Sequence, residues 1–330
     1  MTRTNLPTPF VHTLISSYSG LISIGVITLT VINIIYQRSY IWQPDLLASQ
    51  LIIGISTALI PIFIKSNYKK IALISPILED ITYESNPKQL SNKIKRIEKS
   101  VWADIFPIAV TLLGTYTLYL FGSPWRFAYP FAHNIFSIFV FIFFFIAGSL
   151  GWQYISLIAI LYSASKMDVN ASIFAWPARQ VKRLNQITIE IYFAGTAIYI
   201  GAILSIWTLP WGNFFLTNDN LFTRLWVFPI AIIVIIYFLT TQYLIHRIIV
   251  TSKDIRLEKI DAELENLIEK KNKVNSETNI KLISELISWR RKIEDASEWP
   301  FNIQTSLGII GGVLLPTIGS ISDLFIKLFR

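Results

Sequence analysis

The sequence contains no cysteine, and this absence excludes disulfide bonds, thiol catalysis and metal sites built on thiolates. Charged residues are also scarce, at 15% of the 330 residues, against about 25% in an average soluble domain. Hydrophobic residues reach 53% instead. A composition of this kind predicts an integral membrane protein, whose apolar side chains face lipid.

Catalytic and cofactor-binding motifs are missing as well. The chain has no G-x-S-x-G, H-E-x-x-H, G-x-G-x-x-G or Walker pattern. Its three histidines, His12, His133 and His246, lie far apart in the sequence and near the ends of apolar runs. We interpret them as interfacial or capping residues and not as metal ligands. We therefore expect no enzyme activity, no cofactor and no metal.

Long apolar runs predict an all-α integral membrane protein, because about 20 helical residues match a hydrocarbon core about 30 Å thick. Six runs are long enough, and they would form three helical hairpins within a transmembrane domain of residues 1–250. The fourth run exceeds one untilted crossing, so we expect it to tilt or to project from the membrane. The expected spans are residues 19–36, 46–64, 103–121, 134–162, 187–209 and 225–250.

The distribution of lysine and arginine predicts the orientation of these spans. Eight lie in residues 65–102 and four in 163–186, whereas 37–45, 122–133 and 210–224 hold one each. The alternation places both termini in the cytoplasm, and the Ile-, Asn- and Lys-rich composition favours a bacterial inner (plasma) membrane. The net charge of +8 follows from the same asymmetry. We therefore expect the lipid bilayer, and no nucleic acid, as a partner.

A charged segment follows the sixth run, and two apolar seams pass through it. We expect residues 251–298 to form a helical hairpin, or arm, in which the sixth span continues into the cytoplasm. Apolar side chains recur there at spacings of three and four, as in the heptads of a helix seam. The seams would close on each other, on the basic 65–102 segment, or on neighbouring subunits. The seam residues are Leu257, Ile260, Leu264, Leu267, Leu282, Leu286, Trp289 and Ile293.

The remaining segment, residues 299–330, is apolar but ambiguous. Residues 304–322 carry no charge, yet they contain Pro316 and four glycines. A seventh span would leave Lys327 and Arg330 outside, against the preference of positive residues for the cytoplasmic side. We therefore expect a re-entrant or interfacial helix.

Two acidic residues, Asp104 and Glu190, lie in the first turn of expected spans. In one interpretation, each carboxylate meets the positive end of a helix dipole in the wet headgroup zone. In the other, an oligomer gathers them into a ring at the cytoplasmic mouth of a cation pathway. Thr240, Thr241 and Gln242 of the sixth span either hydrogen-bond between helices or line a pore.

The layout resembles that of uncharacterised bacterial multi-span membrane proteins. The stretch "SEWPFNIQTSLGIIGGVLLP", the basic segment after the second span and the charged hairpin after the last carry this resemblance. It implies no activity and assigns no role to any residue.

Six mostly uncharged spans can hardly enclose a water path alone, whereas several copies can build one on a shared axis. The sequence therefore favours a homo-oligomeric channel or pore-type effector, gated through its cytoplasmic arm by a protein or a small-molecule regulator. The alternative is a membrane-anchored scaffold or sensor whose arm docks a cytoplasmic protein. A small secondary transporter fits less well, because no buried charge pair and, outside the tail, no broken mid-membrane helix is visible.

Overall fold

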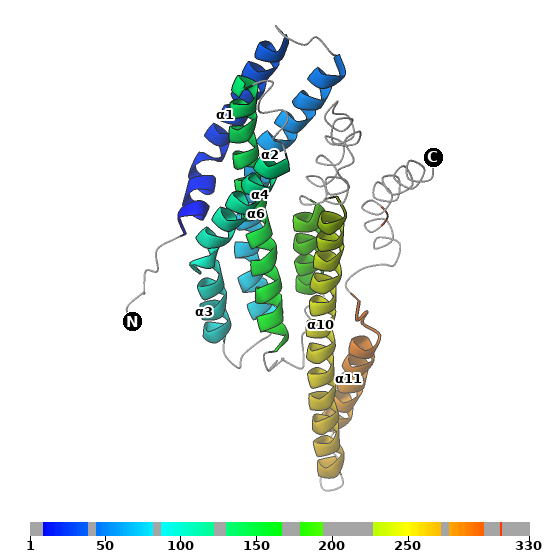
Figure 1. Ribbon diagram of the computed structural model, residues 1–330. Helices are drawn as coiled ribbons and strands as arrows, with labels where there is room; N and C mark the ends of the chain where they lie inside the picture. Colours follow the sequence, from blue (N-terminus) through cyan, green and yellow to red (C-terminus); the bar gives the residue numbers. More distant parts are fainter. Residues whose placement is uncertain are drawn as a thin grey trace.

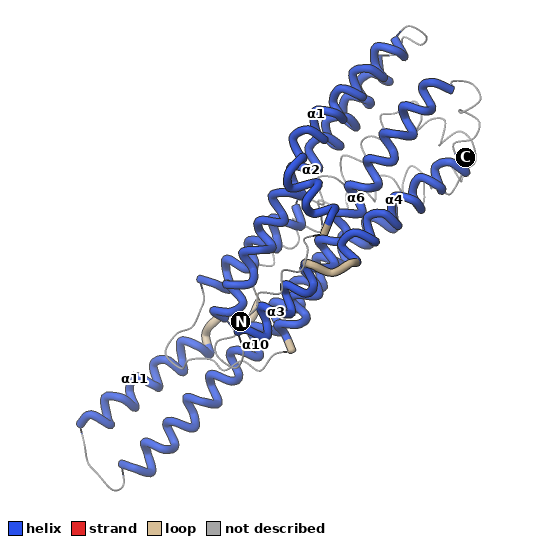
Figure 2. The backbone as a smooth tube through the Cα atoms, turned by 90° about the vertical axis from the view of Figure 1, so that its left-hand side faces the viewer, coloured by secondary structure: helices blue, strands red, loops and turns tan. Residues whose placement is uncertain are grey.

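A computed structural model of the chain describes residues 9–38, 44–81, 87–121, 130–166, 179–193, 227–271, 277–299 and 311. Nearly all of these residues are helical, and no strand occurs among them, which confirms the all-α class. The helices form an elongated bundle, and a two-helix hairpin projects from one end of it (Figure 1, Figure 2).

The described helices alternate in direction along the bundle, except that the short α3 and α4 follow one another in the same direction (Figure 1). In chain order they are α1 (Phe10–Arg38), α2 (Pro44–Ile81), α3 (Pro87–Glu98), α4 (Trp102–Phe121), α6 (Pro130–Ser165), an unlabelled helix over residues 179–193, α10 (Val227–Lys271) and α11 (Glu277–Glu294).

Local sequence signals explain where several helices begin. α2, α3 and α6 start at Pro44, Pro87 and Pro130. Proline suits the first turn because its φ is already helical and an N–H there would lack an intrahelical partner. At the start of α4, the Ser100 hydroxyl accepts a hydrogen bond from the N–H of Trp102 at 3.3 Å, as an N-cap residue does.

The polar segment expected after the second span is largely helical. α2 continues past residue 64 to Ile81, and α3 covers much of the rest of the segment. Hydropathy alone misses this extension because it is amphipathic: Ile71, Ile74 and Leu78 are buried, whereas Lys69 is exposed. A helix can leave an apolar zone and continue as long as one face stays covered.

Other expected spans also belong to longer helices. α1 begins at Phe10, ahead of the apolar run at 19, and α6 reaches 36 residues. Two described stretches, Phe144–Ser165 and Ile232–Glu269, are long and apolar enough to cross a membrane. A shorter apolar stretch covers Ser17–Ile32.

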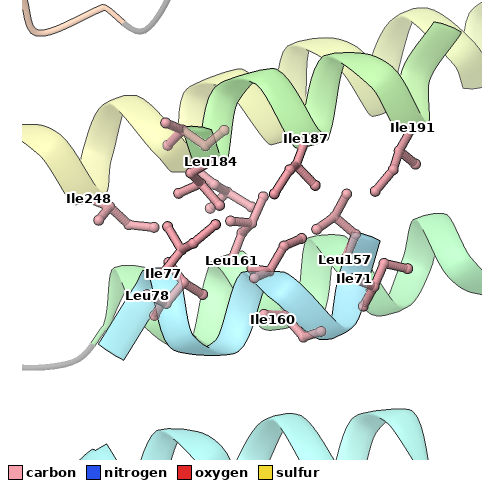
Figure 3. Packing of buried hydrophobic residues seen from close by; sticks show 14 of the residues in the cluster. Ile71, Ile77, Leu78, Leu157, Ile160, Leu161, Leu184, Ile187, Ile191 and Ile248 are labelled. Atoms are coloured by element: carbon pink, nitrogen blue, oxygen red, sulfur yellow. The ribbon is translucent and has the colours of Figure 1, made fainter. Parts of the chain in front are cut away.

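The main core lies where α2, α6, helix 179–193 and α10 meet (Figure 3). Each helix contributes buried leucine or isoleucine side chains, for example Leu78, Leu157, Leu184 and Ile248. A second cluster joins α1, α2 and α6 and consists of Val11, Ile15, Ile60, Ile64, Ile146 and Leu150.

Glycine lets α4 and α6 approach closely. A Cβ atom on Gly148 of α6 would lie 2.8 Å from the Cα of Pro107 and 3.1 Å from its carbonyl oxygen. Gly54 of α2 similarly faces Thr30 of α1, whose side chain would collide with a Cβ. Small residues of this kind are typical of closely packed membrane helices.

Two expectations fall mostly outside the described residues. The re-entrant or interfacial helix of residues 299–330 is described only at Trp299 and Gly311. Of the expected fifth span, 187–209, the structure describes residues 187–193, which are helical.

Candidate functional site

Asp104 caps a neighbouring helix. Its carboxylate accepts hydrogen bonds from the N–H of Phe10 at 3.1 Å and from the N–H of Val11 at 2.8 Å. These N–H groups open α1, where no intrahelical partner is available and the helix dipole favours an anion. Asp104 also lies in the first turn of α4, as expected from the sequence. Its carboxylate is therefore next to the positive ends of two helix dipoles, those of α4 and α1.

We expect Asp104→Ala to release the start of α1, at a cost of about 1 kcal/mol for a lost cap. Asp104→Asn retains an acceptor and should lose less. Hydrogen exchange of the amides of residues 10–13 measures the effect, with the exposed Asp254→Ala as the control. Unchanged exchange in Asp104→Ala would contradict the capping role.

Tyr68 of α2 lies near Asp104, and Gln153 of α6 lies near Tyr68. Burial raises the pKa of the Tyr68 phenol to about 12, Gln153 offsets part of that rise, and the charge of Asp104 adds to it. The Gln153 Nε2 donates to the carbonyl oxygen of Ile64 at 2.9 Å, whereas its amide oxygen has no partner among the described residues. Together these groups form a polar cluster where α1, α2, α4 and α6 meet.

Glu190 lies in the body of a helix and not in its first turn, because the described part of this helix already includes residue 179, before the apolar run at 187. Its carboxylate pairs with Lys70 of α2 at 2.9 Å and accepts a hydrogen bond from Gln186 at 3.0 Å. The pair is partly exposed, so its contribution to stability is small. Asp104 and Glu190 therefore have different partners, on different helices.

The three polar residues of the expected sixth span have different surroundings. Thr241 is buried and its hydroxyl bonds to its own helix, 3.0 Å from the carbonyl oxygen of Tyr237. Thr240 is partly exposed. Gln242 is only 2% exposed, and neither atom of its amide has a partner among the described residues. Burying an amide without a hydrogen-bond partner costs free energy. Of these three residues, Gln242 would therefore gain most from binding a water molecule or an ion.

A tyrosine cluster, which the sequence did not indicate, fixes α10 one turn before Gln242. Tyr237 stacks on Tyr154 of α6, with ring centroids 4.1 Å apart. Tyr192 of helix 179–193 stacks on the other side at 6.5 Å. The Tyr154 hydroxyl donates to the carbonyl oxygen of Ile191 at 3.3 Å. The cluster joins three helices whose contacts depend on the bundle arrangement and on no local motif.

The two apolar seams of the arm close on each other. Ile260, Leu267, Leu286 and Ile293 are buried in one cluster, and the other four seam residues pack against it, half-buried. This is the first of the three expected alternatives. The inner faces of the hairpin therefore need no neighbouring subunit to cover them.

A polar latch holds the end of α11 against α10. The Lys253 Nζ donates to the carbonyl oxygen of Glu294 at 2.7 Å and pairs with the Glu298 carboxylate at 3.1 Å. The ring of His246 stacks on Trp299 with centroids 4.0 Å apart, and its Nδ1 lies 2.9 Å from the Glu298 carbonyl oxygen. Lysine suits this place because the last carbonyls of a helix lack partners.

We expect Lys253→Met to loosen the last turn of α11, because the carbonyl oxygen of Glu294 loses its donor. Amide exchange there should accelerate about tenfold, which corresponds to about 1.4 kcal/mol. The exposed Lys93→Met of α3 serves as the control. Equal exchange in both variants would show that Lys253 does not hold the hairpin.

Among the described residues, no group of three or more His, Asp or Glu side chains could hold a metal ion. In comparisons with protein-family models, curated proteins and solved structures, no match to this chain is found. Its function is therefore inferred from its residues alone.

Proposed function

We propose that the chain is a six-span bacterial inner-membrane protein that assembles into a homo-oligomeric channel, gated through its cytoplasmic arm. The observation that carries this proposal is α10, a single helix of 45 residues. At about 1.5 Å per residue it is roughly 68 Å long, more than twice the thickness of a ~30 Å hydrocarbon core. The arm is thus joined without a break to the segment that carries Thr240, Thr241 and Gln242.

Large apolar side chains on the outside of the bundle support the membrane location. Water would cover these side chains in a soluble monomer, whereas lipid tails would cover them in a membrane. Two of the six proposed spans contain the long apolar stretches Phe144–Ser165 and Ile232–Glu269. The other four are proposed from the exposed apolar side chains and from the hydropathy of the sequence. The exposed residues include Leu21, Ile24 and Ile35 of α1, Ile55 and Ile62 of α2, Leu112 and Leu113 of α4, and Ile232, Ile233 and Ile236 of α10.

The position of α3 supports the proposed orientation. Its Ile94 is buried in the main core, whereas Lys93, Lys95 and Arg96 are exposed. α3 lies toward the end of the bundle from which the arm projects (Figure 1). Because positive residues favour the cytoplasmic side, that end and the arm belong in the cytoplasm.

In the proposed channel, Gln242 of each copy supplies a polar contact to the pathway. Its amide, buried and without a partner among the residues that the structure describes, corresponds to a closed pathway. A movement of α10 that turned Gln242 toward a shared axis would give the amide water or an ion as a partner. A protein or small molecule that binds the arm more tightly in one of these arrangements would bias the equilibrium between them.

Two measurements on the full-length protein test the proposal. Mass photometry of the detergent-purified protein gives the number of copies, and potassium or sodium flux into liposomes gives conduction. We expect an oligomer that conducts, and a strong loss of flux in Gln242→Leu. Tyr243→Leu, at the exposed neighbouring position, is the matched control. A monomer without flux would contradict the channel and favour the membrane-anchored scaffold.

A further inference from the structure

One side of the arm hairpin is strongly acidic. Acidic residues recur along α10 at spacings of three or four, so they lie along one side of the helix. It is the side on which Arg290 of α11 reaches Asp261, with the Nε 2.8 Å from the carboxylate oxygen. We call this side the acidic flank; its α10 residues are Asp254, Glu258, Asp261, Glu265 and Glu269.

The acidic flank also carries exposed isoleucines toward the tip of the arm. Ile268 and Ile280 are each 53% exposed, and Ile287 is 50% exposed. Ile268 follows Asp261 by about two helical turns, and Ile287 precedes Arg290 by about one turn. Ile280 precedes Ile287 by about two turns, so all three isoleucines lie on the acidic side. Large apolar side chains exposed in a charged segment mark a contact surface.

The opposite side of the hairpin, which we call the basic flank, has more lysine than glutamate, and Trp289 lies beside it. Its charged residues are Lys281, Glu285 and Lys292 of α11 and Lys259 and Glu263 of α10. Lys281 precedes Arg290 by nine residues, and Lys292 follows it by two. Both lysines therefore lie roughly half a turn away from Arg290 around α11. Both lysines are exposed, and the Lys292 Nζ lies 5.0 Å from the centre of the Trp289 ring. The two flanks therefore differ in charge.

The charges on the two flanks are level with each other along the arm. α10 and α11 are antiparallel, and Asp261 pairs with Arg290 while Lys253 pairs with Glu298. Moving one residue forward along α10 therefore corresponds to moving one residue backward along α11. By this register Glu258 and Lys292 are level to within one residue, and so are Glu269 and Lys281. The acidic flank of one copy can therefore meet the basic flank of another without any shift along the arm.

We propose that the acidic flank of each arm docks on the basic flank of a second copy, so that the arms form a ring. Contacts between unlike surfaces are head-to-tail, and they close into a ring when the rotation between copies permits it. Glu258 and Glu269 pair with lysines of the next copy, and the exposed isoleucines cover the side of its Trp289. This inference rests on the proposed function, because it identifies the arm's partner as another copy of the same chain.

The absence of cysteine makes the contact directly testable by cross-linking. Full-length Glu269→Cys and Lys281→Cys chains, each with a different affinity tag, are co-expressed and treated with a short bis-maleimide. We expect cross-links between differently tagged copies, and few in either variant alone. Glu263→Cys co-expressed with Lys281→Cys is the control, because both positions lie on the basic flank. Equal cross-linking in the single variants would show a two-fold contact and overturn the proposal.

Exchanging the charges gives a second test that needs no cysteine. Glu269→Lys and Lys281→Glu should each weaken association roughly threefold, as expected for an exposed ion pair. The double variant E269K/K281E should restore it, because every interface then regains an opposite pair. No restoration would overturn the proposal.

Mass photometry separates the two ways in which the inference can fail. An oligomer without cross-links between flanks overturns the arm contact and leaves the channel proposal standing. A monomer overturns both.

Discussion

Truncation of Leu286 to alanine is expected to destabilise the arm hairpin by about 3 kcal/mol, a typical cost for a fully buried leucine. Leu286 is 1% exposed and packs in the cluster of Ile260, Leu267 and Ile293. Because these contacts form within one chain, the hairpin should open in monomer and oligomer alike. Hydrogen exchange of the α11 amides should accelerate on the order of a hundredfold, since each ~1.4 kcal/mol is a factor of ten.

The adjacent position provides the control. Ile287 is 50% exposed, so Ile287→Ala should change the stability of the hairpin by no more than about 0.5 kcal/mol. If arm rings form, this variant should instead weaken association between copies. Similar exchange in the two variants would mean that the inner seam is not the core of the arm.

Replacement of Gly148 by leucine is expected to force α4 and α6 apart. Even a Cβ there would lie 2.8 Å from the backbone of Pro107, and backbone cannot rotate away as a flexible side chain can. Overpacking of this kind costs about 3 kcal/mol. Thermal unfolding of the detergent-purified protein should therefore occur at a clearly lower temperature.

The matched control is Gly25→Leu of α1, where nothing lies within 4 Å of an added Cβ. Leucine is a better helix former than glycine by roughly 0.8 kcal/mol, so this variant should be as stable as the parent or slightly more stable. A similar loss of stability in both variants would show that helix approach at Gly148 is not the cause.

The sequence predicted best those features that depend on local pattern. The apolar run expected as the third span, 103–121, has nearly the same bounds as the helix α4 (Trp102–Phe121), because apolar residues fill that helix almost throughout. The seam pairs of the arm were also predicted, since their heptad spacing places them on one side of each helix. The choice among three ways to close the seams needed the structure.

Contacts between distant parts of the chain could not be predicted. Phe10 and Asp104 are 94 positions apart, and nothing in either segment marks the other as its partner. The same holds for Lys70 with Glu190 and for Lys253 with the end of α11. Such pairs depend on how the helices are arranged. Hydropathy also misplaced Glu190, because it reports the apolar run and not the longer helix that contains it.

α10 is held on two different faces along its length. In the bundle it buries the face of Tyr237, Thr241 and Ile248, and in the arm it buries that of Ile260 and Leu267. At 3.6 residues per turn these faces are roughly a third of a turn apart. Beyond Pro229 the helix contains neither glycine nor proline. It therefore resists twisting, and a rotation of its arm end would be transmitted to its other end. Because α11 packs beside α10, a force that pushes α11 sideways would rotate α10 about its own axis. This rotation would change the direction in which Gln242 points. Every residue would keep its position along the axis of α10.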